Sequence, residues 1–376
     1  MNSHLIPTYR QPVNDHWILW FEAVNRYTIV DANFVVLLDI YIEASNRESF
    51  VENLNNAFDF DRETAMALEA KITHFLLEVN TKTKTPKHKK VNPKLVNLNK
   101  TATYNAFNII FQVKAETPEL LHLVNPPLEH LRTRTTKSAI KTIFYISEQG
   151  EQLHLFLNGV PIDSFPKASY HLLQGRFATL LLGALHNIED SEWLASFHAS
   201  TLAKNGKAIM LAGASGSGKS TLSALLAFQG FDFVSDDITG MLSSNLQVYS
   251  YPAALSVKSG AFEVLKIQVP QLESIDPALK HPKGLVKFLP APQQSAKHYP
   301  CNQVVLVKYS QDPTPTQFGA IPTVKALEVL IPDTWISPKP AHAKAFLNWI
   351  RSLQAYELQY HNTPEAMEII ESLFKT

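Results

Sequence analysis

The chain has 376 residues, which at roughly 150 residues per domain predicts two or three domains. Hydrophobic residues make up 45% and charged residues 18%, so the chain can bury a sizeable core and is not globally disordered, collagen-like or a coiled coil. Lys plus Arg number 34, as do Asp plus Glu, so there is no basic excess to attract nucleic acid. We expect a folded globular protein with no nucleic-acid partner.

Cysteine content and apolar runs indicate the compartment. The single cysteine, Cys301, cannot form an internal disulfide or a Cys-rich zinc site. Neither a charged-then-apolar leader nor an apolar run of about 18 residues occurs. The sequence therefore predicts a cytoplasmic protein without membrane insertion.

Residues 1–80 are predicted to form a small helical domain with a short hairpin in front. Apolar residues there recur at three- and four-residue spacing, as in Val35, Leu38 and Ile42. Residues 81–100 then switch to Lys, Thr, Pro and Asn and contain seven lysines. Such a composition buries little and repels itself, so we interpret 81–100 as a basic linker. Contact of its lysines with nucleic acid or acidic lipid is the alternative.

Residues 101–190 are expected to form a β-meander followed by a helix. The strand-like runs are AFNIIFQV, IKTIFYIS, EQLHLFL and VPIDSF, and a helical pattern extends from about Ala168 to Leu185. Residues 191–376 alternate strand and helix patterns, which predicts an α/β domain in a chain that is α+β overall.

The strongest motif fits G-x-x-x-x-G-K-[ST] and lies between the apolar strand AIMLA and the helix KSTLSALLAF. Its glycines let the backbone wrap so that N–H groups point at phosphate oxygens. Lys219 is expected to reach the β- and γ-phosphates of ATP, and Ser220 to bind Mg²⁺. The predicted nucleotide-binding residues are Gly213, Ala214, Ser215, Gly216, Ser217, Gly218, Lys219, Ser220 and Thr221.

Two adjacent carboxylates follow the loop. Asp236 and Asp237 end the apolar strand at 231–234, 17 residues after Lys219, so one helix and one strand return them toward the phosphates. We assign Asp236 as the base for the acceptor and Asp237 as the metal partner, with the order between the two left open. Paired acids also commonly cap a turn, which is the alternative interpretation.

The sequence signatures of two other nucleotide-binding classes are missing. No N-K-x-D segment and no L-S-G-G-Q signature occurs, which argues against GTPases and ABC transporters. Downstream of the loop the only arginine is Arg351. Transition-state charge would then fall on Mg²⁺, Lys219 and other lysines such as Lys258 or Lys287, unless Arg176 or a partner's arginine reaches in.

The run from His198 through GASGSGKSTLSALLAFQGFDFVSDDITG resembles the catalytic domain of HPr kinase/phosphorylase and its HPr-kinase-related relatives. In that family a histidine precedes the loop and a strand ends in paired acids; here 15 residues separate His198 from Gly213. The resemblance implies a P-loop fold like that of PEP carboxykinase, with Mg²⁺-ATP as donor and a hydroxyl, typically of serine, as acceptor. It also implies that His198 is a catalytic residue that tunes or orients Asp236.

The resemblance is specific over 198–240 and weaker beyond it. The E-x-R-G stretch of the bifunctional enzymes is missing, so neither phosphorylase activity nor HPr as substrate is implied. Residues 1–80 resemble PqqD-like peptide-recognition domains, a winged-helix type of fold that binds leader peptides; a generic helical docking module is the alternative. The family often forms oligomers, so a homo-oligomer is one expectation.

Two classes of function remain open. The first is a kinase that transfers the γ-phosphoryl group of ATP to a serine of a protein or peptide, or to a small-molecule hydroxyl. The second is a nucleotide-gated binding or scaffold protein of a peptide-modifying system, in which ATP orders the loop and the N-terminal unit holds a leader-peptide-like partner. The joint occurrence of loop, paired acids and His198 favours the kinase.

Overall fold

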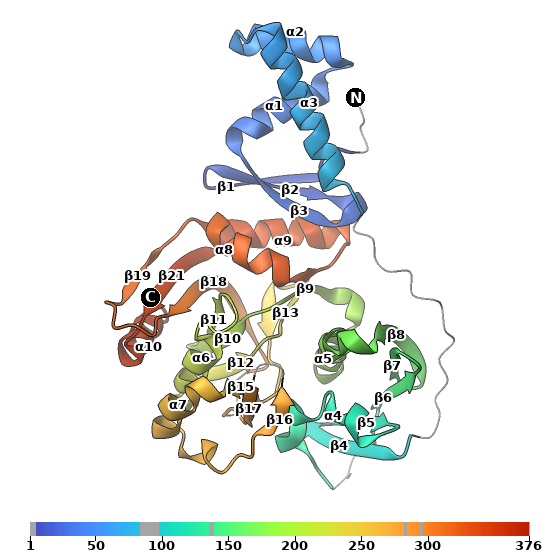
Figure 1. Cartoon of the computed structure of the whole chain (residues 1–376), viewed down its shortest axis with the longest axis vertical. Coiled ribbons are helices and arrows are strands. Elements are labelled where there is room, and N and C mark those ends of the chain that lie inside the picture. The colour runs from blue at the N-terminus through green and yellow to red at the C-terminus, as the bar shows by residue number, and fades with distance from the viewer. Residues whose placement is uncertain (1–4, 83–97, 135–138, 282–283, 293–295, 376) are drawn as a thin grey trace.

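The computed structural model describes residues 5–82, 98–134, 139–281, 284–292 and 296–375. Over these residues the chain is a mixed α/β protein with four sheets (Figure 1). Most of the predicted linker 81–100 lies outside the described residues. No helix in the described ranges has the length and apolarity needed to cross a membrane.

The N-terminal unit is a three-stranded antiparallel sheet followed by three helices. These elements are β1 (Tyr9–Val13), β2 (His16–Phe21), β3 (Arg26–Asp31), α1 (Ala32–Glu43), α2 (Arg47–Phe58) and α3 (Arg62–Val79). Each helix begins after a side chain that accepts a hydrogen bond from the first turn: Asp31, Asn46 and Asp61. The unit therefore contains more sheet than expected, because the aromatic and β-branched residues of 16–31 pair as strands.

A five-stranded sheet follows, in the spatial order β4-β5-β6-β7-β8. Its elements are β4 (Lys100–Ala106), β5 (Ile109–Ala115), α4 (Pro118–His122), β6 (Thr142–Gln149), β7 (Gln152–Leu157), β8 (Val160–Pro166) and α5 (Tyr170–His186). Strands β6, β7 and β8 pair antiparallel in succession, but β5 runs parallel to β6. The arrangement thus differs from a simple meander: parallel pairing requires a crossover connection, and α4 follows β5 on the way to β6.

The largest sheet has ten strands, with the path β12-β10-β11-β18-β14-β13-β9-β20, and β21 pairing both β18 and β19. Its strands are β9 (Trp193–Phe197), β10 (Ser200–Lys204), β11 (Lys207–Ala212), β12 (Asp232–Ser235), β13 (Thr239–Leu242), β14 (Gln247–Tyr249), β18 (His298–Tyr309), β19 (Gln317–Ala320), β20 (Trp335–Ile336) and β21 (Gln354–Tyr360). Strands β11, β18 and β21 are parallel, so their carboxyl ends lie at one edge.

A smaller sheet has the order β15-β17-β16. Helices cover both faces of the ten-stranded sheet. The remaining elements are β15 (Leu255–Lys258), β16 (Ala278–His281), β17 (Gly284–Leu289), α6 (Lys219–Phe228), α7 (Phe262–Gln268), α8 (Thr323–Leu330), α9 (Pro340–Ser352) and α10 (Thr363–Ser372). On β11, Met210 joins the core beneath α8 and α9, whereas Ile209 and Leu211 join the core beneath α6 and α10.

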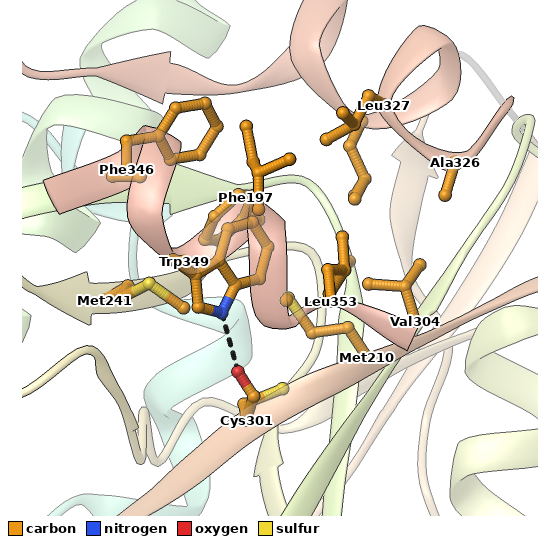
Figure 2. Close-up of a cluster of buried hydrophobic side chains, with 14 of the residues drawn as sticks. Phe197, Met210, Met241, Cys301, Val304, Ala326, Leu327, Phe346, Trp349 and Leu353 are labelled. Carbon is orange, nitrogen blue, oxygen red and sulfur yellow. Dashed lines mark hydrogen bonds between the residues drawn. The ribbon is translucent and has the colours of Figure 1, made fainter. Parts of the chain in front are cut away.

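The core beneath α9 is dense and mainly apolar (Figure 2). Phe346 and Trp349 of α9 stack on each other with ring centroids 5.7 Å apart, and Trp349 also meets Phe197 at 5.3 Å. The indole Nε1 of Trp349 donates to the carbonyl oxygen of Cys301 at 2.7 Å, so its polar atom is satisfied inside the core. Helix α9 is thereby fixed to β9 and β18.

The N-terminal sheet lies against α8 and α9 rather than apart from them (Figure 1). Ile18 and Trp20 of β2 belong to the same buried cluster as Phe346, and Tyr27 meets the Phe346 ring at 5.2 Å. The amide of Asn25 donates to the carbonyl oxygen of Ile336 at 2.8 Å. The sheet of the N-terminal unit is therefore part of the main core.

Candidate functional site

The site begins at the glycine-rich loop that connects β11 to α6. Gly213, Gly216 and Gly218 have φ values of +144°, +88° and +95°, which favour glycine. A Cβ at Gly213 would lie 2.7 Å from the carbonyl oxygen of Val307, and one at Gly218 would lie 2.7 Å from the Tyr360 hydroxyl. The loop thus needs glycine both for its conformation and for its close contact with the ends of β18 and β21.

Cationic and hydroxyl groups line this loop. The Lys219 ammonium is buried and donates to the carbonyl oxygens of Gly213 and Ala214 at 2.7 and 3.1 Å, and Lys258 donates to the Ser215 hydroxyl at 3.2 Å. Within the described residues, the Ser217 hydroxyl is buried without a hydrogen-bond partner. Two cations, an unpartnered hydroxyl and a helix N-terminus in one loop fit a polyanion such as the phosphates of ATP.

Asp236 lies directly behind the loop, after the last residue of β12. The Ser220 hydroxyl donates to its Oδ1 at 3.0 Å, the Ser200 hydroxyl donates to the same oxygen, and the Ser256 N–H donates to Oδ2 at 3.3 Å. Burial and the neighbouring carboxylate of Asp237 raise the pKa of Asp236 to about 7, although these hydrogen bonds favour the ionised form. A cation at Ser220 would stabilise the ionised carboxylate further.

Asp237 is more exposed than Asp236 and has different partners. It has a φ of +65°, in a tight turn that is closed by the Ile238 N–H donating to the Asp236 carbonyl oxygen at 2.9 Å. This conformation is unfavourable for a residue other than glycine and leaves the Asp237 side chain 53% exposed, whereas Asp236 is 9% exposed. Adjacent acids therefore occupy different environments.

His198 contacts Asp237 and not Asp236. Its Nδ1 lies 3.2 Å from the Asp237 carbonyl oxygen, which can only accept, so Nδ1 carries the proton. Its Nε2 lies 3.8 Å from Oδ1 of the Asp237 carboxylate. The imidazole is thus held at the side of the exposed acid.

The strand directions explain why these residues meet. Strand β10 is antiparallel to both β11 and β12, so the start of β10 and the ends of the other two share one edge of the sheet. Residues 198–200, 213–220 and 236–237 all lie at this edge. It is the carboxyl edge of β11, β18 and β21, where open α/β sheets bind their ligands.

Two cavities meet at His198 and Asp237. The first, of about 490 Å³, contains the loop, Lys258 and Tyr309. The second, of about 710 Å³, lies between α5, β9 and the 333–335 segment. His198 and Asp237 line both.

Other candidate cations from the sequence lie in different places. The Lys287 ammonium donates to the carbonyl oxygen of Leu272 at 2.8 Å and is not among the residues that line the loop cavity. Arg176 lines the second cavity and forms ion pairs with Asp190 at 2.7 Å and with Asp163 at 2.9 Å. Of these three cations, Lys258 is the one at the loop.

Several site residues carry no signal in the sequence. Ser200 contacts Asp236 through its hydroxyl and Ser256 through its backbone N–H, and both are ordinary serines on strands. Tyr309 and Tyr360 form the wall behind Gly218, with ring centroids 5.5 Å apart. Their roles depend on tertiary contacts between distant strands, which periodicity does not reveal.

Comparison with known proteins gives a distant structural likeness. No family model and no curated protein matches the chain. Among solved structures, the Hpr(Ser) kinase/phosphatase from Coxiella burnetii is similar with a TM-score of 0.22 and 13% sequence identity, over 48% of this chain and 93% of that chain.

Proposed function

We propose that this protein is an ATP-dependent P-loop kinase that transfers the γ-phosphoryl group to a hydroxyl, that of a serine in a peptide or protein. The observation that carries the proposal is the hydrogen bond from Ser220 to Asp236. It joins a glycine-rich strand-to-helix loop to a carboxylate, and phosphoryl transfer needs both beside one phosphate.

In this proposal residues 213–221 bind the phosphates of ATP. The backbone N–H groups of the loop and the first turn of α6 donate to phosphate oxygens. Lys219 exchanges its two carbonyl partners for the β- and γ-phosphates, and Lys258 supplies a second positive charge on the other side of the loop. The cavity of about 490 Å³ has the size of a cofactor site.

Ser220 and Asp236 are the residues that would hold Mg²⁺, which when bound neutralises charge on the phosphates. This assignment reverses the order that the sequence suggested for the two acids. It is supported by the burial of Asp236 and by the hydrogen bonds that both its oxygens accept, since such a carboxylate cannot also turn to an acceptor in the second cavity.

Asp237 then acts as the base. The acceptor hydroxyl oxygen attacks the γ-phosphorus, its proton passes to the Asp237 carboxylate, and the bond from the γ-phosphorus to the β–γ bridging oxygen breaks, which releases ADP. Support comes from the exposure of Asp237 and its position at the junction of the two cavities. His198 positions this carboxylate through its two contacts with Asp237.

Other expectations remain predictions from the sequence: a leader-peptide-like partner of the N-terminal unit, a homo-oligomer and a cytoplasmic location. A small-molecule hydroxyl as acceptor is the second choice of substrate. A nucleotide-gated scaffold is the second choice of function.

The test is transfer from γ-labelled ATP to proteins of a lysate from the source organism, with mass spectrometry to locate the label. We compare wild type with Lys219→Ala and, as a matched control, with Lys344→Ala on the exposed face of α9. A phosphoserine formed by wild type and the control but not by Lys219→Ala supports the kinase. Tight ATP binding with neither labelled product nor released phosphate contradicts it and favours the scaffold.

A further inference from the structure

The second cavity combines an apolar wall with a single chemically reactive end. The large apolar residues that line it on β8, α5, β9 and β20 are Phe165, Leu172, Leu182, Trp193, Phe197 and Trp335. Leu172 and Trp335 are each 50% exposed, so large apolar side chains stand open to solvent. Pockets of this size and lining bind apolar ligands with a few polar anchors.

The second cavity lies where the acceptor of the proposed kinase would bind. This inference rests on that proposed function. The loop, Lys219 and Ser220 line only the first cavity. The second cavity begins where the first ends, at His198 and Asp237. A molecule that fills it therefore presents its inner end to the proposed base and to the γ-phosphate.

Charge restricts what the cavity accepts. Among the described residues that line it, Arg176 is the one guanidinium, and two carboxylates already neutralise it: Asp190 with distances of 2.7 and 2.8 Å, and Asp163 at 2.9 Å. Asp237 and Asp333 add two more carboxylates to the lining. An acidic acceptor would bring negative charge against them, whereas an uncharged or basic one would not.

We propose that the acceptor is a serine flanked by large apolar residues and without neighbouring acids, carried on a peptide segment that enters the cavity between α5 and β20. The apolar flanks bury against the six lining side chains, and the serine hydroxyl meets Asp237. The peptide continues into solvent past Leu172 and Trp335.

One residue allows the cavity to be filled without disturbing the loop. Gly175 lines the cavity on α5, and a Cβ built there meets nothing within 4 Å. Its φ is not in the left-handed region, so a larger residue fits the helix without strain. Gly319 on the edge strand β19 is equally open and lines neither cavity, which makes Gly319→Phe a matched control for Gly175→Phe.

The experiment uses the full chain and two short synthetic peptides with a central serine. One peptide has leucine and phenylalanine on both sides of the serine, and the other has aspartate and glutamate there. Binding is followed by tryptophan fluorescence, because Trp193 and Trp335 line the cavity, and transfer is followed by phosphoserine formation. The apolar peptide should bind at least about tenfold more tightly than the acidic one, and Gly175→Phe should weaken it by about tenfold while Gly319→Phe binds as wild type does.

Three results overturn the proposal: equal binding of the two peptides, unchanged binding by Gly175→Phe, and faster transfer to a free apolar alcohol than to the apolar peptide. Failure of the proposed function looks different. In that case the apolar peptide still changes the fluorescence, Gly175→Phe still weakens binding by about tenfold, and no phosphoserine forms, so the cavity binds the peptide but not as an acceptor.

Discussion

The Ser220 hydroxyl donates to Oδ1 of Asp236 across 3.0 Å and thereby connects the first turn of α6 to the end of β12. Asp236 and the glycine-rich loop are therefore parts of one hydrogen-bonded unit. The next residue, Asp237, is outside this unit and points to the cavity junction. Adjacent acids should consequently respond differently to the same substitution.

Asp236→Asn and Asp237→Asn should separate nucleotide binding from transfer. We expect Asp236→Asn to remove most of the Mg²⁺-dependent gain in ATP affinity, because asparagine is a weaker magnesium ligand. Asp237→Asn should keep that gain and lower the transfer rate by about 10²- to 10⁴-fold, the range for a general base. Calorimetric titration of ATP with and without Mg²⁺, beside a single-turnover assay, measures both. The opposite pattern would restore Asp236 as the base.

His186 should make the protein sensitive to acid. Burial lowers its pKa to about 4, and its Nε2 lies 2.8 Å from the Ser250 carbonyl oxygen, which accepts its proton. The unfolded chain binds the extra proton near pH 6.5, so this contribution to stability is present above pH 6.5 and is lost as pH falls toward 4, at up to about 1.4 kcal/mol per pH unit. In His186→Gln, the free energy of unfolding measured with urea should fall less between pH 7 and pH 4 than it does in wild type. If it falls equally in both, His186 is not the source of the acid sensitivity.

Trp349→Phe should destabilise the fold. The substitution removes the Nε1 donor and leaves the buried Cys301 carbonyl oxygen without that hydrogen bond. We expect a loss of about 1–3 kcal/mol in the free energy of unfolding. Urea denaturation measures this loss. Trp335→Phe is the control and should change the free energy of unfolding little, because Trp335 on β20 is half-exposed.

Ile18→Ala tests whether the N-terminal unit folds with the rest of the chain. Ile18 is fully buried in the cluster that contains Phe346. Its truncation should lower the free energy of unfolding by about 2–5 kcal/mol, and the loss should be seen equally by far-UV circular dichroism and by protection of the α9 amides from hydrogen exchange. If α9 protection were unchanged, the N-terminal sheet would be an independent module.

The sequence allowed the loop, the alternating strands and helices, and the paired acids to be predicted, because each has a local pattern. The different settings of Asp236 and Asp237 could not be predicted, since they follow from one positive φ and from serines far along the chain. Parallel pairing of β5 with β6 depends on the path between them, which strand periodicity does not encode. The packing of Ile18 against the core beneath α9 could not be predicted either, because the residues involved are more than 300 positions apart in the sequence.

The strands that pack against the glycine-rich loop follow it by about 90 to 140 residues in the sequence, so the ribosome synthesises them later than the loop. Gly218 faces Tyr360, and the backbone carbonyl oxygen of Ser217 accepts a hydrogen bond from the Tyr309 N–H. At about 5–20 residues per second, β21 leaves the ribosome on the order of ten seconds after the loop. A nascent chain therefore contains its glycine-rich segment before the strands that shape this segment have been synthesised.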